Sequence, residues 1–273
     1  IFVFLRSPGA ATTVLLGATI IALIVANSPL ATQYMSLVNL PLGPLTAMEW
    51  VNDALMAIFF LFVGLEVKRE LVSGELNTNA KRIMPGIAAL FGVIVPAIIF
   101  YLIAGSNDVY VHGWAIPTAT DIAFAIGVIT ALGSRVPNSM KVFLTALAVI
   151  DDLIAIIVIA IFYAASINLF YLVASVIVTG LLIYCNRTGY VRSLSYIILG
   201  VILWYCILRS GLHATMAGVI LAMTIPERGK IGKKYVRPMQ HWEHYLSNWV
   251  SFVIVPIFAF FNAGVNLDGF GMA

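Results

Sequence analysis

Apolar stretches long enough to cross a lipid bilayer recur along the whole sequence. One of the clearest runs from Val142 to Tyr163, and its 22 residues would cover a bilayer core of roughly 30 Å at about 1.5 Å per helical residue. Of the 273 residues, 62% are hydrophobic and only 10% are charged, a balance that excludes an ordinary soluble domain. The chain is therefore predicted to be a polytopic membrane protein.

Gly, Pro, Asn and charged residues separate the apolar stretches into about nine predicted spans. The predicted fold class is all-α, a transmembrane helix bundle that forms a single integral membrane domain over residues 1–273. The predicted spans are 10–27, 47–66, 84–104, 112–132, 140–163, 168–185, 193–208, 210–225 and 247–265.

The basic residues predict how these spans are oriented. With the N-terminus inside, 14 of the 15 Lys and Arg residues fall on inner segments, and only Arg209 lies outside. Cytoplasmic loops collect positive charge in this way, so we expect a multi-pass membrane protein with a cytoplasmic N-terminus. The basic residues are spread over separate loops and form no single stripe, which argues against nucleic acid as a partner.

Two adjacent aspartates, Asp151 and Asp152, lie at the midpoint of the Val142–Tyr163 run. Each ionised carboxylate at that depth costs about 2.5–3.5 kcal/mol on insertion scales, so two in tandem bring no structural gain. The pair therefore indicates a functional site. The alternative is a buried and permanently neutral pair that is hydrogen-bonded to a neighbour.

A third carboxylate, Asp121, lies near the centre of the predicted span 112–132. Pro117 removes a backbone donor just upstream, and Thr120 offers a hydroxyl to a disrupted backbone, so a broken helix is predicted. Irregular backbone at membrane depth is tolerated where it lines a wet cavity, which favours an ion path. The alternative is a polar cap that touches no ion.

The short turn 134–138 makes the neighbouring spans antiparallel, so Asp121 is expected to meet Asp151 and Asp152 near the midplane. Oxygen donors suit a hard cation, and desolvation with like-charge crowding also favours protonation of such carboxylates. Competition between a cation and protons for one site is by itself an exchange mechanism. The alternatives are a passive cation channel and a cation binder without transport; the settings of the aspartates do not match an intramembrane protease.

Two further charged clusters lie near predicted inner ends of spans. Glu66, Arg69 and Glu70 stand within little more than one helical turn, where residues three or four apart share a face. Glu243 and His244 stand at the entrance of the last span, and histidine titrates near neutrality. Both clusters are expected on the cytoplasmic side, where they could meet. A solvated helix end with modest ion pairing remains the alternative for the first cluster.

Six separated blocks of the sequence together resemble one family, the NhaA sodium/proton antiporters of bacterial inner membranes. The resemblance covers essentially the whole chain. The blocks are WVNDALMAIFFLFVGLEVKREL at 50–71, WAIPTATDIAFAIGV at 114–128, GSRVP at 133–137, ALAVIDDLIAI at 146–156, SGLHATMAGV at 210–219 and PIFAFFNAGV at 256–265.

The resemblance implies exchange of sodium or lithium for protons in pH and sodium homeostasis, with more than one proton moved per cation and higher activity at alkaline pH. It implies that Asp151 and Asp152 bind sodium and carry protons, and that no cofactor is needed. Asp121, with Thr120 beside it, would balance the facing dipole ends of two broken helices that cross. A homodimer in the lipid bilayer is expected. The implied pH-responsive residues are Glu66, Arg69, Glu70, Glu243 and His244.

The sequence also departs from the family pattern. Ser247 stands where some members have a second histidine, and Gln240 where a lysine is often found, so a different pH response is expected. The family has about twelve spans with a second broken helix, whereas about nine fall within residues 1–273. The chain is therefore expected to be truncated at its C-terminal side, without the intramembrane lysine that pairs with the counterpart of Asp151.

Overall fold

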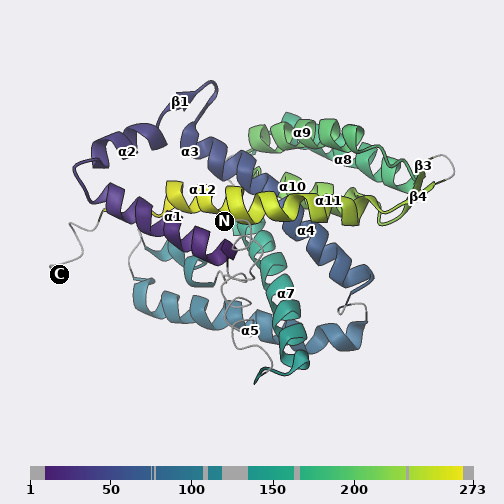
Figure 1. Cartoon of the computed structure of the whole chain (residues 1–273), viewed down its shortest axis with the longest axis horizontal. Helices are drawn as coiled ribbons and strands as arrows, with labels where there is room; N and C mark the ends of the chain where they lie inside the picture. The colour runs from purple at the N-terminus through teal and green to yellow at the C-terminus, as the bar shows by residue number, and fades with distance from the viewer. Residues whose placement is uncertain are drawn as a thin grey trace. The chain divides into compact units, whose positions relative to one another are not determined.

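The structure is a computed structural model that describes residues 10–74, 76, 78–106, 110–118, 135–162, 167–231 and 234–266. Long helices make up most of the described chain (Figure 1), which confirms the predicted all-α polytopic bundle. Two short antiparallel hairpins, which the sequence did not predict, interrupt it: β1 (Pro41–Leu42) pairs with β2 (Leu45–Thr46), and β3 (Gly229–Ile231) with β4 (Lys234–Val236).

The α-helices in chain order are α1 (Ala10–Ala26), α2 (Ala31–Val38), α3 (Ala47–Glu49), α4 (Met56–Val72), α5 (Asn79–Ala104), α7 (Asn138–Phe162), α8 (Leu169–Arg187), α9 (Ser193–Ser210), α10 (Met216–Thr224), α11 (Pro238–Trp249) and α12 (Val255–Asn262). The π-helical segments are η2 (Trp50–Leu55) and η6 (Val250–Ile254), and the 3-10 turns are η3 (Val111–Gly113) and η4 (Ile116–Thr118).

Five continuous helices among the described residues are long and apolar enough to cross a membrane. The pair α1 and α2, which is bent by 118°, could form a sixth span. Large apolar side chains on these helices face outward; Leu102 and Ile103 on α5, for instance, are 79% and 78% exposed. Such surfaces suit lipid tails, which are as apolar as leucine. The five are Ala47–Val72, Asn79–Ala104, Leu169–Arg187, Ser193–Ser210 and Pro238–Asn262.

Two predicted spans differ most from the observed helices at their starts. The span predicted at 210–225 is helical only over Met216–Thr224, because Gly211 adopts a left-handed conformation with φ of 86° that ends α9. The span predicted at 247–265 begins earlier, at Pro238, which occupies the first helical turn where its missing N–H costs nothing. The predicted span 112–132 begins with 3-10 turns, and most of it lies outside the described residues.

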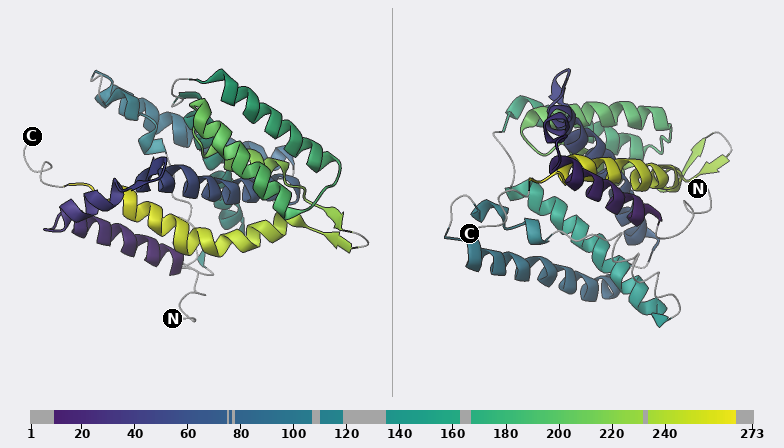
Figure 2. Two further views of the ribbon diagram at one scale, coloured as in Figure 1. Left: turned by 90° about the horizontal axis from the view of Figure 1, so that it is seen from above. Right: turned by 60° about the vertical axis from the view of Figure 1, so that its left-hand side comes forward.

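The chain divides into two compact units. Unit 1 comprises Ile1–Leu65 and Ile167–Ala273, and unit 2 comprises Glu66–Ser166. In unit 1, α8 packs against α9 and α1 against α12, as Figures 1 and 2 show. The core of unit 1 brings together side chains from α4, α8, α9, α10 and α11, with Leu65, Leu182 and Leu203 fully buried. In unit 2, α5 packs against α7 (Figure 2).

Helices α4 and α10 of unit 1 approach each other unusually closely. A Cβ atom added to Gly64 would lie 2.7 Å from the Ala222 side chain, and one added to Gly218 would collide with the α4 backbone. Small residues permit such close approach, which drives helix association where no hydrophobic effect acts between helices. Gly64 and Gly218 therefore allow α4 and α10 to pack this closely.

Candidate functional site

Helix α7 places Asp151 near its middle. The helix has 25 residues, from Asn138 to Phe162, which is a length of about 38 Å at about 1.5 Å per residue. The Asp151 side chain is only 4% exposed. The other buried polar residues in the described part of the chain are Ser175, Ser210 and Thr224, whose hydroxyls bond to carbonyls of their own helices. Among the residues whose side chains are described, Asp151 is thus the one buried residue of the Asp, Glu, Lys, Arg and His types.

Burial makes the charge state of Asp151 depend on what lies beside it. An ionised carboxylate in an apolar interior is costly unless it is paired, hydrogen-bonded, protonated or bound to a cation. Asp151 does take part in an interaction within the protein. A carboxyl group in this setting can exchange a proton for a cation at low cost, because each partner relieves the same burial penalty.

The remaining predicted members of this site are less fully described. Asp152 follows on the same helical turn of α7, and its side chain lies outside the described part. Thr120 and Asp121 lie outside the described residues altogether. The segment just before them forms the 3-10 turns η3 and η4 and no α-helix, so the irregular backbone expected near Pro117 is present. The meeting of Asp121 with Asp151 and Asp152 stays a prediction.

The charged cluster at the end of α4 contains the Glu66–Arg69 pair that the sequence spacing indicated, and a closer contact between the neighbours Arg69 and Glu70 that it did not. Arg69 Nη2 lies 2.9 Å from Glu70 Oε1 and 3.9 Å from Glu66 Oε1. The Glu70 side chain is 13% exposed, whereas those of Glu66 and Arg69 are about one-third exposed at 35% and 36%. Glu70 is therefore shielded from solvent more than Glu66 or Arg69. Its contact with Arg69 is a close charge-assisted hydrogen bond.

Glu243 and His244 lie on α11 in unit 1, inside the helix that begins at Pro238. Glu243 is half-buried and takes part in an interaction, and His244 is exposed. Gln240 accepts a bond of 3.5 Å from Arg237. Because the cluster around Glu70 belongs to unit 2, the meeting of the two clusters stays a prediction.

Sequence reasoning missed a polar π-helical turn at the start of the second span. In η2, Asn52 Oδ1 accepts a bond of 2.9 Å from the Asn262 amide on α12. The Asp53 carbonyl accepts one of 3.0 Å from the Trp204 indole, and Trp50 stacks on Trp204 with ring centroids 5.8 Å apart. Trp50 is thus a packing residue of unit 1. The signal available in the sequence was the polar pair Asn52–Asp53 inside an apolar stretch. π-helical turns occur frequently at functional sites.

The Trp204 indole is expected to stabilise this turn measurably. Trp204→Phe removes the N–H donor and leaves the Asp53 carbonyl with one partner fewer, so the free energy of unfolding should fall by about 1 kcal/mol. Thermal unfolding of the purified full-length protein in detergent measures the loss. Trp249→Phe is the control, because Trp249 is 53% exposed and should tolerate the change within about 0.5 kcal/mol. Equal unfolding temperatures for the two variants would contradict the role of the indole.

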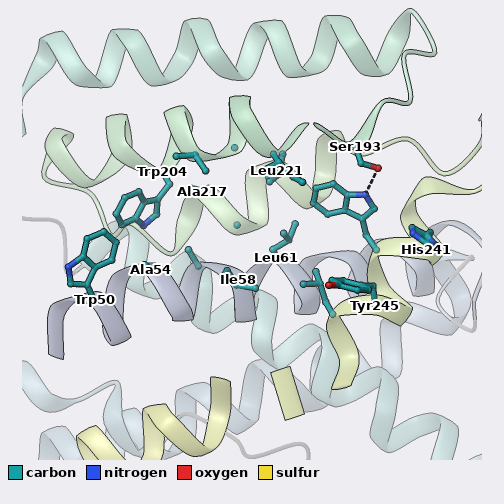
Figure 3. A pocket seen from close by; sticks show the side chains of 17 residues that line it. Trp50, Ala54, Ile58, Leu61, Ser193, Trp204, Ala217, Leu221, His241 and Tyr245 are labelled. Atoms are coloured by element: carbon teal, nitrogen blue, oxygen red, sulfur yellow. Dashed lines mark hydrogen bonds between the residues drawn. The ribbon is translucent and has the colours of Figure 1, made fainter. Parts of the chain in front are cut away.

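Unit 1 also holds a cavity of about 640 Å³ between α4, α9, α10 and α11 (Figure 3). Alanine, leucine, isoleucine and tryptophan side chains line most of it. Its polar end carries His241 and a hydrogen bond of 3.1 Å from the Trp242 indole to the Ser193 hydroxyl. The lining contains no carboxylate, so it offers no negative charge to balance a bound cation. The ion site predicted on α7 stays the candidate.

The long apolar helices and the buried carboxyl group define the class of protein. The chain is a multi-pass, all-α membrane protein that carries a buried carboxyl group in one of its long helices. A family model described as Na+/H+ antiporter 1 matches residues 3–273. The chain belongs to this Na+/H+ antiporter family.

Curated relatives agree with this assignment. A protein of Mesorhizobium japonicum named Na(+)/H(+) antiporter NhaA is 52% identical over 272 residues, which cover 98% of this chain and 68% of the relative. Proteins with the same name from Brucella ovis and Rhizobium etli are 50% and 47% identical, and the matches cover 97% and 99% of this chain and 68% and 70% of those proteins. The family consists of transporters and not of enzymes, and membership favours exchange over the passive channel considered above.

Proposed function

We propose that the protein exchanges sodium or lithium for protons across a bacterial inner membrane, and that Asp151 and Asp152 bind the cation and the protons in turn. The observation that carries the site is the burial of Asp151 at the middle of α7, in a chain that belongs to a Na+/H+ antiporter family. An acid at membrane depth is costly, and such residues mark ion pathways and proton relays.

The proposed mechanism is competition. With a proton on each, both carboxyl groups are neutral, and a bound sodium ion offsets one of their two negative charges, so both loaded forms lower the burial penalty. The empty ionised form keeps the full penalty and crosses least readily. Because one site cannot hold both ions, movement of sodium in one direction requires movement of protons in the other.

The supporting residues belong to the same proposal. Asp121 and Thr120 are proposed to hold the broken backbone next to the ion site. The cytoplasmic pH-responsive region is proposed to comprise Glu66, Arg69, Glu70, Glu243 and His244. With the N-terminus in the cytoplasm, the inner segments carry 14 of the 15 basic residues, as the positive-inside rule requires. A homodimer embedded in lipid is the proposed assembly.

Proton coupling is the decisive test. The full-length protein is purified, reconstituted into proteoliposomes and given a sodium gradient, while a trapped dye reports the internal pH. We expect sodium entry to drive proton exit, and an imposed membrane potential to change the rate because more than one proton moves per cation. Sodium flux without opposite proton movement would support the channel and reject the exchange.

A further inference from the structure

The loop that follows α4 folds back onto the end of that helix. The backbone N–H groups of Ser73 and Gly74 both donate to the Arg69 carbonyl at 2.9 Å, and that of Leu76 donates to the Glu70 carbonyl at 3.1 Å. The Leu76 side chain is only 1% exposed. These bonds satisfy carbonyls that have no partner within the helix, so the loop caps the C-terminal end of α4.

Arg82, in the first turns of α5, closes this cap from the other side. Its Nη2 donates to the Leu71 carbonyl at 3.0 Å, and its Nε donates to the Leu76 carbonyl. Its Nη1 lies 3.4 Å from Asn79 Oδ1. A planar guanidinium can bridge two carbonyls at once, and its positive charge is favourable at the C-terminal end of α4.

The cap in turn confines the Glu70 side chain. A Cβ atom added to Gly74 would lie 2.7 Å from both Glu70 Cα and Glu70 Cδ and would also overlap its Oε2 atom. The carboxylate that pairs with Arg69 therefore occupies space that only glycine leaves free. Any movement of the loop that Arg82 holds must change the room available to this carboxylate.

We infer that Arg82 is a positioning residue for the pH-responsive cluster: it holds the loop that fixes the Glu70 carboxylate against Arg69. This inference rests on the proposed function, in which the cluster senses pH. Arg82 and Glu70 interact through the loop between them. Glu75 lies outside the described residues. The charged side chains of this part of unit 2 are Glu66, Lys68, Arg69, Glu70, Lys81 and Arg82.

The test compares the pH dependence of exchange in everted membrane vesicles that carry the full-length protein. Glu70→Gln should shift the pH of half-maximal activity, and Arg82→Gln should shift it in the same direction by about half a pH unit, which is the size of one net hydrogen bond expressed as a pH shift. The double variant should shift it no further than the larger single change, because both act on one element. Arg187→Gln is the charge-matched control, because Arg187 is exposed at the end of α8 in unit 1, and it should leave the profile unchanged.

Arg82→Lys separates the bridging geometry from the charge. Lysine keeps the positive charge but lacks the planar fork whose Nε and Nη2 reach the two carbonyls, so this variant should fold and show most of the Arg82→Gln shift. A wild-type profile for Arg82→Lys or Arg82→Gln, with Glu70→Gln shifted, would overturn the inference and leave the proposed function standing. An unshifted Glu70→Gln would instead remove the proposed pH role of the cluster. Additive shifts in the double variant would show that Arg82 acts independently of Glu70.

Discussion

Asp151→Asn is expected to abolish sodium/proton exchange. Asparagine nearly preserves the shape of the side chain, so α7 should still form, but it can neither release a proton nor balance a sodium ion. Removing one partner of a buried charge pair costs about 3 kcal/mol or more. A loss of that size in the free energy of ion binding corresponds to about a 100-fold lower rate of exchange. Sodium-driven proton movement in everted vesicles, normalised to the amount of protein in the membrane, measures it.

Asp152→Asn is expected to cause a loss of the same order. Glu227→Gln serves as the control, because Glu227 pairs at 3.5 Å with the exposed Arg228 in the segment before β3 and has no place in the proposed site. It should exchange at the wild-type rate. Full exchange by Asp152→Asn would reject the site as proposed, whichever result Asp151→Asn gives.

The positions of helices could be predicted where polar residues flank an apolar run on both sides. The predicted span 140–163 corresponds to α7 at Asn138–Phe162, and 168–185 to α8 at Leu169–Arg187, because polar residues stand at both ends of each. The predicted span 210–225 failed because a glycine among apolar residues changes the backbone without changing hydropathy. The last span failed at its start, since its first turns are amphipathic and hydropathy detects only the apolar remainder.

The candidate site could be predicted only where its signal lies in side-chain chemistry. Asp151 and Asp152 stood out because a carboxylate is costly at membrane depth. The bonds of Arg82 and Trp204 to carbonyls could not be foreseen, because every residue has a carbonyl and its availability depends on how a helix ends or widens. The π-helical turn η2 has no hydropathy signature of its own, so its polar residues appeared to be part of a regular span.

Gly218→Ala is expected to separate two helices of unit 1. The added Cβ would overlap the carbonyl oxygen of Ala57 and lie 2.7 Å from the backbone nitrogen of Leu61, so α10 would have to move away from α4. Neither atom belongs to a side chain that can rotate aside. Such overpacking costs about 1–3 kcal/mol, and a lower thermal unfolding midpoint with reduced yield in the membrane should report it.

Gly180→Ala is the matched control for this effect. Gly180 lies inside α8, and nothing approaches within 4 Å of the Cβ that alanine would add. Alanine has the higher helix propensity by about 0.8–1 kcal/mol, so this variant should be as stable as the wild type or more stable. Opposite shifts of the unfolding midpoint for the two glycines would therefore locate the effect in the contact between α10 and α4. If Gly218→Ala is as stable as Gly180→Ala, the close approach of α10 to α4 does not limit the stability of unit 1.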